Sequence, residues 1–367
     1  MSKQGWTYKK LGEVATLKSG YTPTSTDLLD KGELPYFKVG DMNKEGNERY
    51  LLFTSSFVNS TFKSFPKGSI VFPKNGAAIA TNKKRILSQP SVVDLNTAVL
   101  IPIIKVDIDF LFFWISKIDF RKITRRGTIP TLDTKVLMQL NVPVPPVAEQ
   151  ERIVDELDLL SGIIEKKKEQ LKAYDQLAQS IFYTMFGDPI TNEKGWEVKK
   201  LGEVCINCDS LRKPITAKDR IKGSIPYYGA SGVVDYVNDY IFDGEYLLVS
   251  EDGANLLARS TPIAFSIKGK TWVNNHAHVL QFETWFQQVF IEYSINLRDI
   301  SMIVTGCAQP KLTQAAMNDM NISYPPLALQ QEFAEKIEAI EQQKALIQQS
   351  IAEVQTLFDS RMDYWFG

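Results

Sequence analysis

The sequence predicts an α+β protein in which two tandem, mixed α/β domains are separated by an antiparallel two-helix coiled coil, in a pseudo-twofold, circular arrangement. Three observations predict this fold. The segment Gly5–Val14 returns as Gly195–Val204 with eight of ten residues identical. A Pro-Pro pair precedes a long charged stretch at 145–146 and again at 325–326. Both charged stretches repeat apolar residues with the 3.5-residue period of a coiled coil.

The two α/β domains are expected at residues 1–145 and 188–325. In each, a turn glycine opens an apolar run, an aromatic-rich helical stretch follows, and a turn with glycine and proline comes next. The equivalent pairs are 68–72 with 244–248, 110–120 with 285–295, and 127–130 with 306–310. Because these turns recur while the residues between them differ, the duplication predicts two related surfaces with different targets.

The two long helices are expected at 146–187 and 326–367. Proline is tolerated in a first helical turn, and Gly187 followed by Pro189 is a typical helix end. The predicted seam residues, which alternate steps of three and four, are Ile153, Leu157, Leu160, Ile164, Leu171, Tyr174, Ile181, Phe333, Ile337, Ile340, Ile347, Ile351, Val354 and Phe358. Two matched seams in one chain favour an intrachain pair, and an oligomerisation handle is the alternative.

The composition is that of an ordinary globular protein. The 367 residues include 42 Lys+Arg against 43 Asp+Glu, and 44% are hydrophobic, which excludes a disordered or fibrous chain. The longest apolar runs are far shorter than a membrane span, and the N-terminus has no apolar signal segment. Three cysteines fit a reducing compartment, so we expect a cytoplasmic protein.

The ordered set of motifs resembles the specificity subunit of type I restriction-modification enzymes. In that family each target recognition domain opens with a Gly-Trp-x-x-x-x-Leu-Gly-Glu-like segment, here Gly5–Glu13 and Gly195–Glu203. Each ends in an Ile-x-x-Pro-x-Pro-Pro-Leu-x-Glu-Gln-like segment, here 142–150 and 322–330. The second copy has Leu329 where glutamate is usual.

The resemblance implies a DNA-binding subunit that reads a bipartite, asymmetric site in double-stranded DNA. The paired helices would set the gap between the half-sites; Gln150 to Met185 is 36 residues, about 54 Å or about 16 base pairs. The resemblance also implies docking to two methylation subunits and, where the system restricts, to two restriction subunits. Aromatic residues at the helix ends are expected to be exposed for a partner, namely Phe182, Phe186, Tyr364, Trp365 and Phe366.

The resemblance implies that the chain itself is not an enzyme and holds no cofactor. S-adenosylmethionine would be bound by the methylation subunits, and ATP and Mg by the restriction subunits. The complex would then be an adenine-specific DNA methyltransferase and ATP-dependent endonuclease. The residues agree, since the chain has no Asn-Pro-Pro-Tyr motif and no phosphate-binding glycine loop. A protein-interaction scaffold without DNA specificity is the alternative function, and a zinc-dependent hydrolase or self-contained methyltransferase is a third.

A metal site is not expected. Cys205 and Cys208, with His276, His278 and Cys307 further along, offer soft ligands for zinc, but they lack the spacing of a zinc finger. Buried thiols and hydrogen-bonded histidines are the expected alternative.

Charge differs between the domains. Residues 1–145 hold 21 Lys+Arg against 12 Asp+Glu, a net of +9, whereas residues 188–325 have a net of −3. Phosphate neutralisation supplies most non-specific affinity for DNA, so only the first domain is expected to bind a duplex strongly by charge alone. We therefore expect the second to depend more on base contacts and on its partner.

The candidate DNA-binding residues are polar side chains beside glycines or at strand ends, where backbone and side chains can approach phosphates and base edges. In the first domain they are Lys18, Ser19, Gly20, Tyr21, Thr22, Lys74, Asn75, Arg125, Arg126 and Thr128. In the second they are Tyr227, Tyr228, Ser231, Asn255, Asn274, Asn275, His276, Gln309 and Lys311. For Arg125 and Arg126 a solvated helix end is the alternative, and for His276 a buried hydrogen-bond network.

Overall fold

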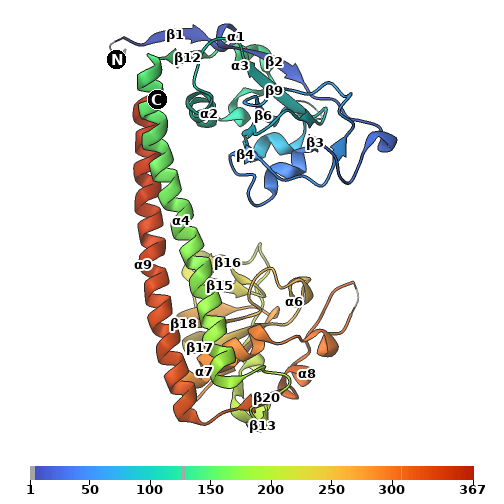
Figure 1. The fold of residues 1–367 in the computed structure, drawn as a ribbon. Helices are drawn as coiled ribbons and strands as arrows, with labels where there is room; N and C mark the ends of the chain where they lie inside the picture. The colour runs from blue at the N-terminus through green and yellow to red at the C-terminus, as the bar shows by residue number, and fades with distance from the viewer. Residues whose placement is uncertain (1–4, 126, 128, 307) are drawn as a thin grey trace. The chain divides into compact units, whose positions relative to one another are not determined.

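The computed structural model describes residues 5–125, 127, 129–306 and 308–367 and divides the chain into two compact units. Unit 1 contains the described residues up to Lys166 together with Ile351–Gly367, and unit 2 contains Lys167–Ser350. Each unit therefore holds one α/β domain and parts of both long helices (Figure 1). In the described residues, no helix combines the length and the apolar character that crossing a membrane requires.

Unit 1 is built on an antiparallel sheet in the order β2-β9-β6-β7-β4, with β4 added parallel to β7, and a smaller sheet β5-β3-β8 beside it. The strands are β1 Thr7–Lys10, β2 Ala15–Ser19, β3 Leu34–Phe37, β4 Tyr50–Leu51, β5 Phe57–Val58, β6 Ile70–Pro73, β7 Arg85–Leu87, β8 Val92–Val93, β9 Thr97–Pro102, β10 Thr124–Arg125, β11 Thr131–Leu132 and β12 Asn141–Val144. The helices are α1 Leu11–Val14, α2 Ile108–Lys117, α3 Thr134–Met138 and α4 Val147–Phe186.

Unit 2 has one six-stranded sheet in the order β14-β19-β17-β18-β15-β16. The strands are β13 Glu197–Lys200, β14 Ile206–Asn207, β15 Lys222–Gly229, β16 Gly232–Val237, β17 Phe242–Ser250, β18 Ala264–Val273, β19 Ala277–Gln281 and β20 Asn321–Tyr324. The helices are α5 Leu201–Val204, α6 Asn255–Ala258, α7 Trp285–Leu297, α8 Gln314–Asn318 and α9 Leu327–Phe366.

The duplicated motifs form the same local structure in both units. The Gly-Trp segment forms β1 and β13, which pair antiparallel with β12 and β20, the strands that precede the Pro-Pro pairs. The following Leu-Gly-Glu-Val forms α1 and α5, and Glu13 and Glu203 each accept a hydrogen bond from the backbone N–H three residues earlier. Gln150 and Gln330 donate to the carbonyls of Pro145 and Pro325, at 2.8 Å in both copies. The repeat therefore fixes where each long helix starts.

The two long helices run antiparallel in each unit. In unit 1 the start of α4 meets the end of α9, where Arg361 donates to Glu156. In unit 2 the end of α4 meets the start of α9, where the Lys344 ammonium lies 2.7 Å from the Asp175 carboxylate. Every predicted seam residue is buried or half-buried. The expected fold class, two α/β domains with an antiparallel helix pair, is confirmed.

The prediction that the helix-end aromatics are exposed is wrong for Phe182, Phe186 and Trp365, which are 1%, 3% and 6% exposed. Phe182 and Phe186 pack into the apolar core of unit 2, and the Trp365 ring stacks on Trp6 in unit 1 with ring centroids 6.2 Å apart. These aromatics join the helices to the domains because burying their large apolar area stabilises the fold. Of the five, only Tyr364 is largely exposed, at 56%.

Candidate nucleic-acid interface

In unit 1, two of the predicted segments, 18–22 and 74–75, meet two further segments at one end of the main sheet. We define cluster 1 as residues 19–22, 74–76, 94–97 and 129–131. The Lys74 ammonium donates to the Ser19 hydroxyl at 2.5 Å, and the Lys74 N–H donates to the Asn96 carbonyl at 2.8 Å. The Gly76 N–H donates to the Pro130 carbonyl, also at 2.8 Å. Segments far apart in sequence thus present polar side chains together.

A groove of about 410 Å³ opens beside cluster 1. Its walls include Lys38, Asn75, Asp94, Asn96 and Ile129. Amides can make paired hydrogen bonds to base edges, and the lysine can neutralise a phosphate. The groove therefore has the chemistry that reading of a base requires.

Glycine is needed at position 20 for a different reason from the one the sequence suggested. Gly20 is buried, and a Cβ atom there would lie 2.2 Å from the Asp94 carbonyl oxygen and 2.3 Å from that of Val93. The close approach is therefore between two segments of this chain. Gly20 shapes cluster 1 from beneath.

The remaining candidates of the first domain differ in accessibility. Lys18 and Thr22 are exposed, whereas Tyr21 is half-buried and stacks on Phe62 with ring centroids 6.3 Å apart. The Arg125 guanidinium makes a fork with the Asp133 carboxylate, at 2.6 and 2.9 Å. This fork, with the N–H groups that Asp133 caps at the start of α3, lowers the pKa of Asp133 to about 2. Arg126 and Thr128 lie outside the described residues.

Unit 2 repeats the backbone contacts of cluster 1 with different side chains. We define cluster 2 as residues 230–231, 250–253, 274–276 and 309–311. The Glu251 N–H donates to the His276 carbonyl at 2.9 Å, and the Gly253 N–H donates to the Pro310 carbonyl at 3.0 Å. These bonds match those of Lys74 and Gly76, so Glu251 and Gly253 occupy the equivalent positions. The same framework carries a lysine in one unit and a glutamate in the other.

Several predicted residues of the second domain lie in cluster 2. Ser231, Asn275 and Gln309 are exposed there. The exposed His276 ring places Nδ1 2.9 Å from the Asp252 carboxylate, and Asn274 accepts the His276 N–H at 2.8 Å. Lys311 is half-exposed, with its ammonium 3.1 Å from Glu251.

Three other predicted residues have structural contacts. Tyr227 is 1% exposed, and its hydroxyl accepts the N–H of Ile215. Tyr228 is half-buried against Phe265. The Asn255 side chain closes the turn after α6 by accepting from the Thr261 N–H. These three residues stabilise the loops around cluster 2.

The zinc candidates do not form one cluster among the described residues. Cys205 and Cys208 donate to backbone carbonyls of Leu201 and Ile206, and burial raises the pKa of Cys205 to about 12. His276 and His278 face different carboxylates. Cys307 lies outside the described residues.

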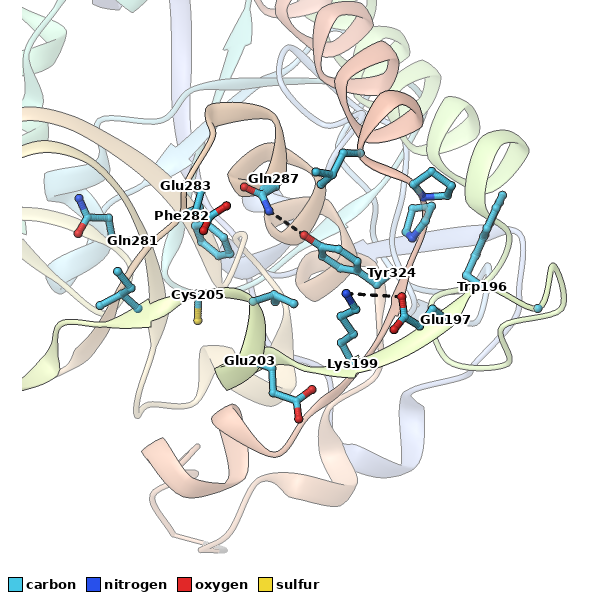
Figure 2. A pocket seen from close by; sticks show the side chains of 16 residues that line it. Trp196, Glu197, Lys199, Glu203, Cys205, Gln281, Phe282, Glu283, Gln287 and Tyr324 are labelled. Atoms are coloured by element: carbon cyan, nitrogen blue, oxygen red, sulfur yellow. Dashed lines mark hydrogen bonds and ion pairs between the residues drawn. The ribbon is translucent and has the colours of Figure 1, made fainter.

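A larger cavity of about 890 Å³ lies elsewhere in unit 2 (Figure 2). It is lined by β13, α5, the end of β19 and the start of α9, and Figure 2 shows Gln287 pointing to Tyr324 and Lys199 pointing to Glu197. The Gln287 amide donates to the Tyr324 hydroxyl at 2.7 Å, and the Lys199–Glu197 ion pair measures 3.5 Å. The lining contains no residue of cluster 2.

The comparison with protein families decides which class of protein this is. The model of the type I restriction modification DNA specificity domain matches residues 3–173 and matches again at residues 193–356. The chain belongs to this specificity family. The two matches coincide with the two copies of the repeat, so the duplication is one of specificity domains.

Relatives of this specificity chain carry related names. A Haemophilus influenzae protein named among the type I restriction enzyme specificity subunits is 34% identical over 144 residues, which are 39% of this chain and 37% of that protein. The MjaIX specificity subunit of Methanocaldococcus jannaschii is 24% identical and aligns with 89% of this chain and 85% of its own length. The crystal structure of a type I restriction-modification S subunit from M. genitalium shares the fold, with 15% identity, a TM-score of 0.55, and coverage of 97% and 95%.

Sequence reasoning about this specificity chain missed Asp94, Asn96, Asp209, Arg212 and the role of His278. Asn96 could have been found from the sequence. It stands directly before an apolar strand, and the predicted residues Asn274–His276 stand before an apolar strand in the same way. Asp209 has no such signal, since its partner His278 lies 69 residues away. Only the sheet brings these two side chains together.

Proposed function

We propose that this chain is the non-catalytic subunit that reads a bipartite, asymmetric DNA site for a type I restriction-modification complex. Clusters 1 and 2 would each read one half-site. One observation supports this most strongly: equivalent backbone hydrogen bonds hold Lys74 in one cluster and Glu251 in the other. Two copies of one framework with different side chains suit an asymmetric site.

The proposed division of labour follows the duplicated sequence. Residues 1–145 and 188–325 would be the target recognition domains, and the helices at 146–187 and 326–367 would be the spacers. Each helix has 40 residues, which is about 60 Å at 1.5 Å per residue. The helix pair would thereby fix the gap between the half-sites.

The proposed partners are double-stranded DNA, two methylation subunits and two restriction subunits. Their chemistry would come with them, S-adenosylmethionine on the methylation subunits and ATP with Mg on the restriction subunits. The exposed Tyr364 and the outward-facing carboxylates of α4 and α9 offer polar surface for such docking. Such a complex would act on the cellular DNA, so we expect the chain in the cytoplasm.

Selection from a random duplex pool tests the proposed function. The full chain is co-purified with its methylation subunit, incubated with the pool, and the retained DNA is sequenced. We expect two short, unrelated half-sites at one fixed gap. An intact complex that enriches no sequence would contradict the proposal and favour a protein-interaction scaffold.

A further inference from the structure

A largely buried group of four charged side chains supports cluster 2 and includes one of its residues, Glu251. Asp209, Arg212, Glu251 and His278 come from three separate segments of unit 2. Nδ1 of His278 lies 2.6 Å from the Asp209 carboxylate, and Arg212 donates to Glu251 at 2.7 Å. A second Arg212 nitrogen lies 3.3 Å from Asp209. The His278 side chain is 1% exposed, and those of Arg212 and Glu251 are 13% exposed.

Two hydrogen bonds hold the His278 ring within this group of four residues, which we call the tetrad. Nε2 of His278 lies 2.9 Å from the Leu312 carbonyl, while Nδ1 faces a carboxylate. Both partners are acceptors, so the ring is held between an acceptor on each side.

Both carboxylates are held in the charged form. Burial raises the pKa of Asp209, but the bonds from His278 and the Val279 N–H outweigh it, and the net shift is downward. Burial likewise raises the pKa of Glu251, but the bonds from Arg212 and Lys311 outweigh it, and the net shift is downward. The two carboxylates are therefore ionised within the network.

The arrangement does not suit a metal ion. Ligand atoms of Asp209, Glu251 and His278 all lie within 4.8 Å of one another. However, the Arg212 guanidinium bonds to both carboxylates and would repel a divalent cation. Nδ1 of His278, which faces the carboxylates, is already hydrogen-bonded to Asp209 at 2.6 Å.

The tetrad contains or is bonded to three of the four segments of cluster 2, namely 250–253, 274–276 and 309–311 with its neighbour Leu312. The Glu251 N–H and carbonyl bond to His276 and Leu312, and Arg212 donates to the Ala277 carbonyl at 2.7 Å. His278 donates to Leu312, which follows Lys311. Removing one member would leave buried charges unpaired and let the loops shift.

The first domain lacks this network. The strand register places Ser19 at the position of Asp209 and Ala98 at the position of His278. The matching backbone bonds place Lys74 at the position of Glu251. At these positions unit 1 has a single hydrogen bond, from Lys74 to Ser19. A defect in the tetrad should therefore affect one domain and leave the other intact.

We propose that Asp209, Arg212, Glu251 and His278 form a positioning network that sets base discrimination at the half-site read by the second domain. The proposal rests on the proposed function, because it assumes that cluster 2 reads DNA. It assigns Asp209, Arg212 and His278 no direct contact with DNA, and within cluster 2 Glu251 acts through its bonds to Arg212 and to the backbone of His276 and Leu312. They act on Asp252, Asn274–His276 and Lys311 through bonds to the backbone of His276, Ala277 and Leu312.

Two amide variants at position 278 test the network. His278→Asn can keep a donor toward Asp209, and His278→Gln can keep one toward Leu312. Each full-length variant is co-purified with the methylation subunit and subjected to the duplex-pool selection. We expect base preference at the second half-site to fall by about tenfold or more, with the first half-site unchanged.

Glu251→Gln, nearly the same in shape, is the second test, and Glu283→Gln, an exposed carboxylate in the cavity of Figure 2, is its matched control. Thermal melting of each complex checks folding. Unchanged preference at the second half-site in folded variants would overturn the network, as would equal losses at both half-sites. If the wild-type complex enriches no half-site, the proposed function fails instead.

Discussion

At the scale of single residues, Gly20 of cluster 1 leaves no room for a side chain. A methyl group there would meet the carbonyl oxygens of Asp94 and Val93 at 2.2 and 2.3 Å. Gly20→Ala should force the backbone apart and lower the free energy of unfolding by about 1–3 kcal/mol, measured by urea denaturation. Gly40→Ala is the control, because a Cβ atom at that position would have open space within 4 Å. Equal stability of the two variants would refute the packing argument.

Lys84 makes the stability of unit 1 depend on pH. It is 3% exposed, and its ammonium donates to the Ile118 carbonyl and lies 4.0 Å from the Phe120 ring centroid. Burial lowers its pKa from 10.5 to about 7. Between these values the unfolded chain binds more protons, so stability rises with pH, by at most about 1.4 kcal/mol per pH unit.

Lys84→Met should remove this rise. Urea titrations from about pH 6 to about pH 10 would measure the difference between wild type and variant. The exposed Lys122→Met should follow the wild-type curve. If the free energy of unfolding of the wild type instead runs parallel to that of Lys84→Met above neutral pH, Lys84 keeps its charge in the folded protein and the prediction is wrong.

Lys74 is the cation of cluster 1 best placed for DNA. If it neutralises a phosphate, Lys74→Ala should weaken binding to all sequences alike and reduce the slope of log K against log salt by about 1. Filter binding or fluorescence anisotropy at several salt concentrations measures this slope. Lys117→Ala is the control, since Lys117 pairs with Asp363 on α9. A loss confined to particular bases would show that Lys74 reads sequence.

At the scale of elements, the buried stripe of α4 stabilises unit 1. Leu157 is fully buried in the apolar core, whereas Leu159 on the same helix is 66% exposed. Leu157→Ala should cost about 2–5 kcal/mol, and Leu159→Ala should cost about 0.5 kcal/mol or less. Chemical denaturation of the two variants compares one substitution on two faces of one helix. If both variants lost a similar free energy of unfolding, the assignment of Leu157 to the buried seam would be wrong.

The seam is also the element that the sequence predicted best. A coiled-coil period repeats over many turns, so each apolar residue supports the interpretation of the next. The period did not predict the burial of the helix-end aromatics. Phe182 and Phe186 fall next to the seam, and they are buried between Phe290 of α7 and the seam residue Phe333 of α9.

At the scale of the whole molecule, the proposed spacer role predicts that helix length determines the gap. Deleting residues 165–171 and 347–353 removes one heptad from each helix and keeps the seam in phase. The preferred gap should shorten by about 10 Å, or about 3 base pairs. Sequencing of selected DNA measures the gap. An unchanged gap in a folded complex would refute the spacer.

The sequence by itself determined the duplication, the two long helices and the family, because these are carried by motifs and periods that can be read along the chain. It also indicated parts of clusters 1 and 2, such as 19–22, 74–75 and 274–276, because glycines and polar residues stand next to apolar strands there. It did not reveal which segments meet. Lys74 and Glu251 share no local sequence, and only their equivalent backbone bonds relate them.

The tertiary structure alone decided how each cluster is supported. Gly20 faces the chain itself, Arg125 is held by Asp133, and His278 bonds to Asp209 across 69 residues. Such contacts depend on strand register and on how loops close, and neither leaves a periodic trace in the sequence. The physical reason is that periodicity reports burial along one element, whereas a site is made where several elements end.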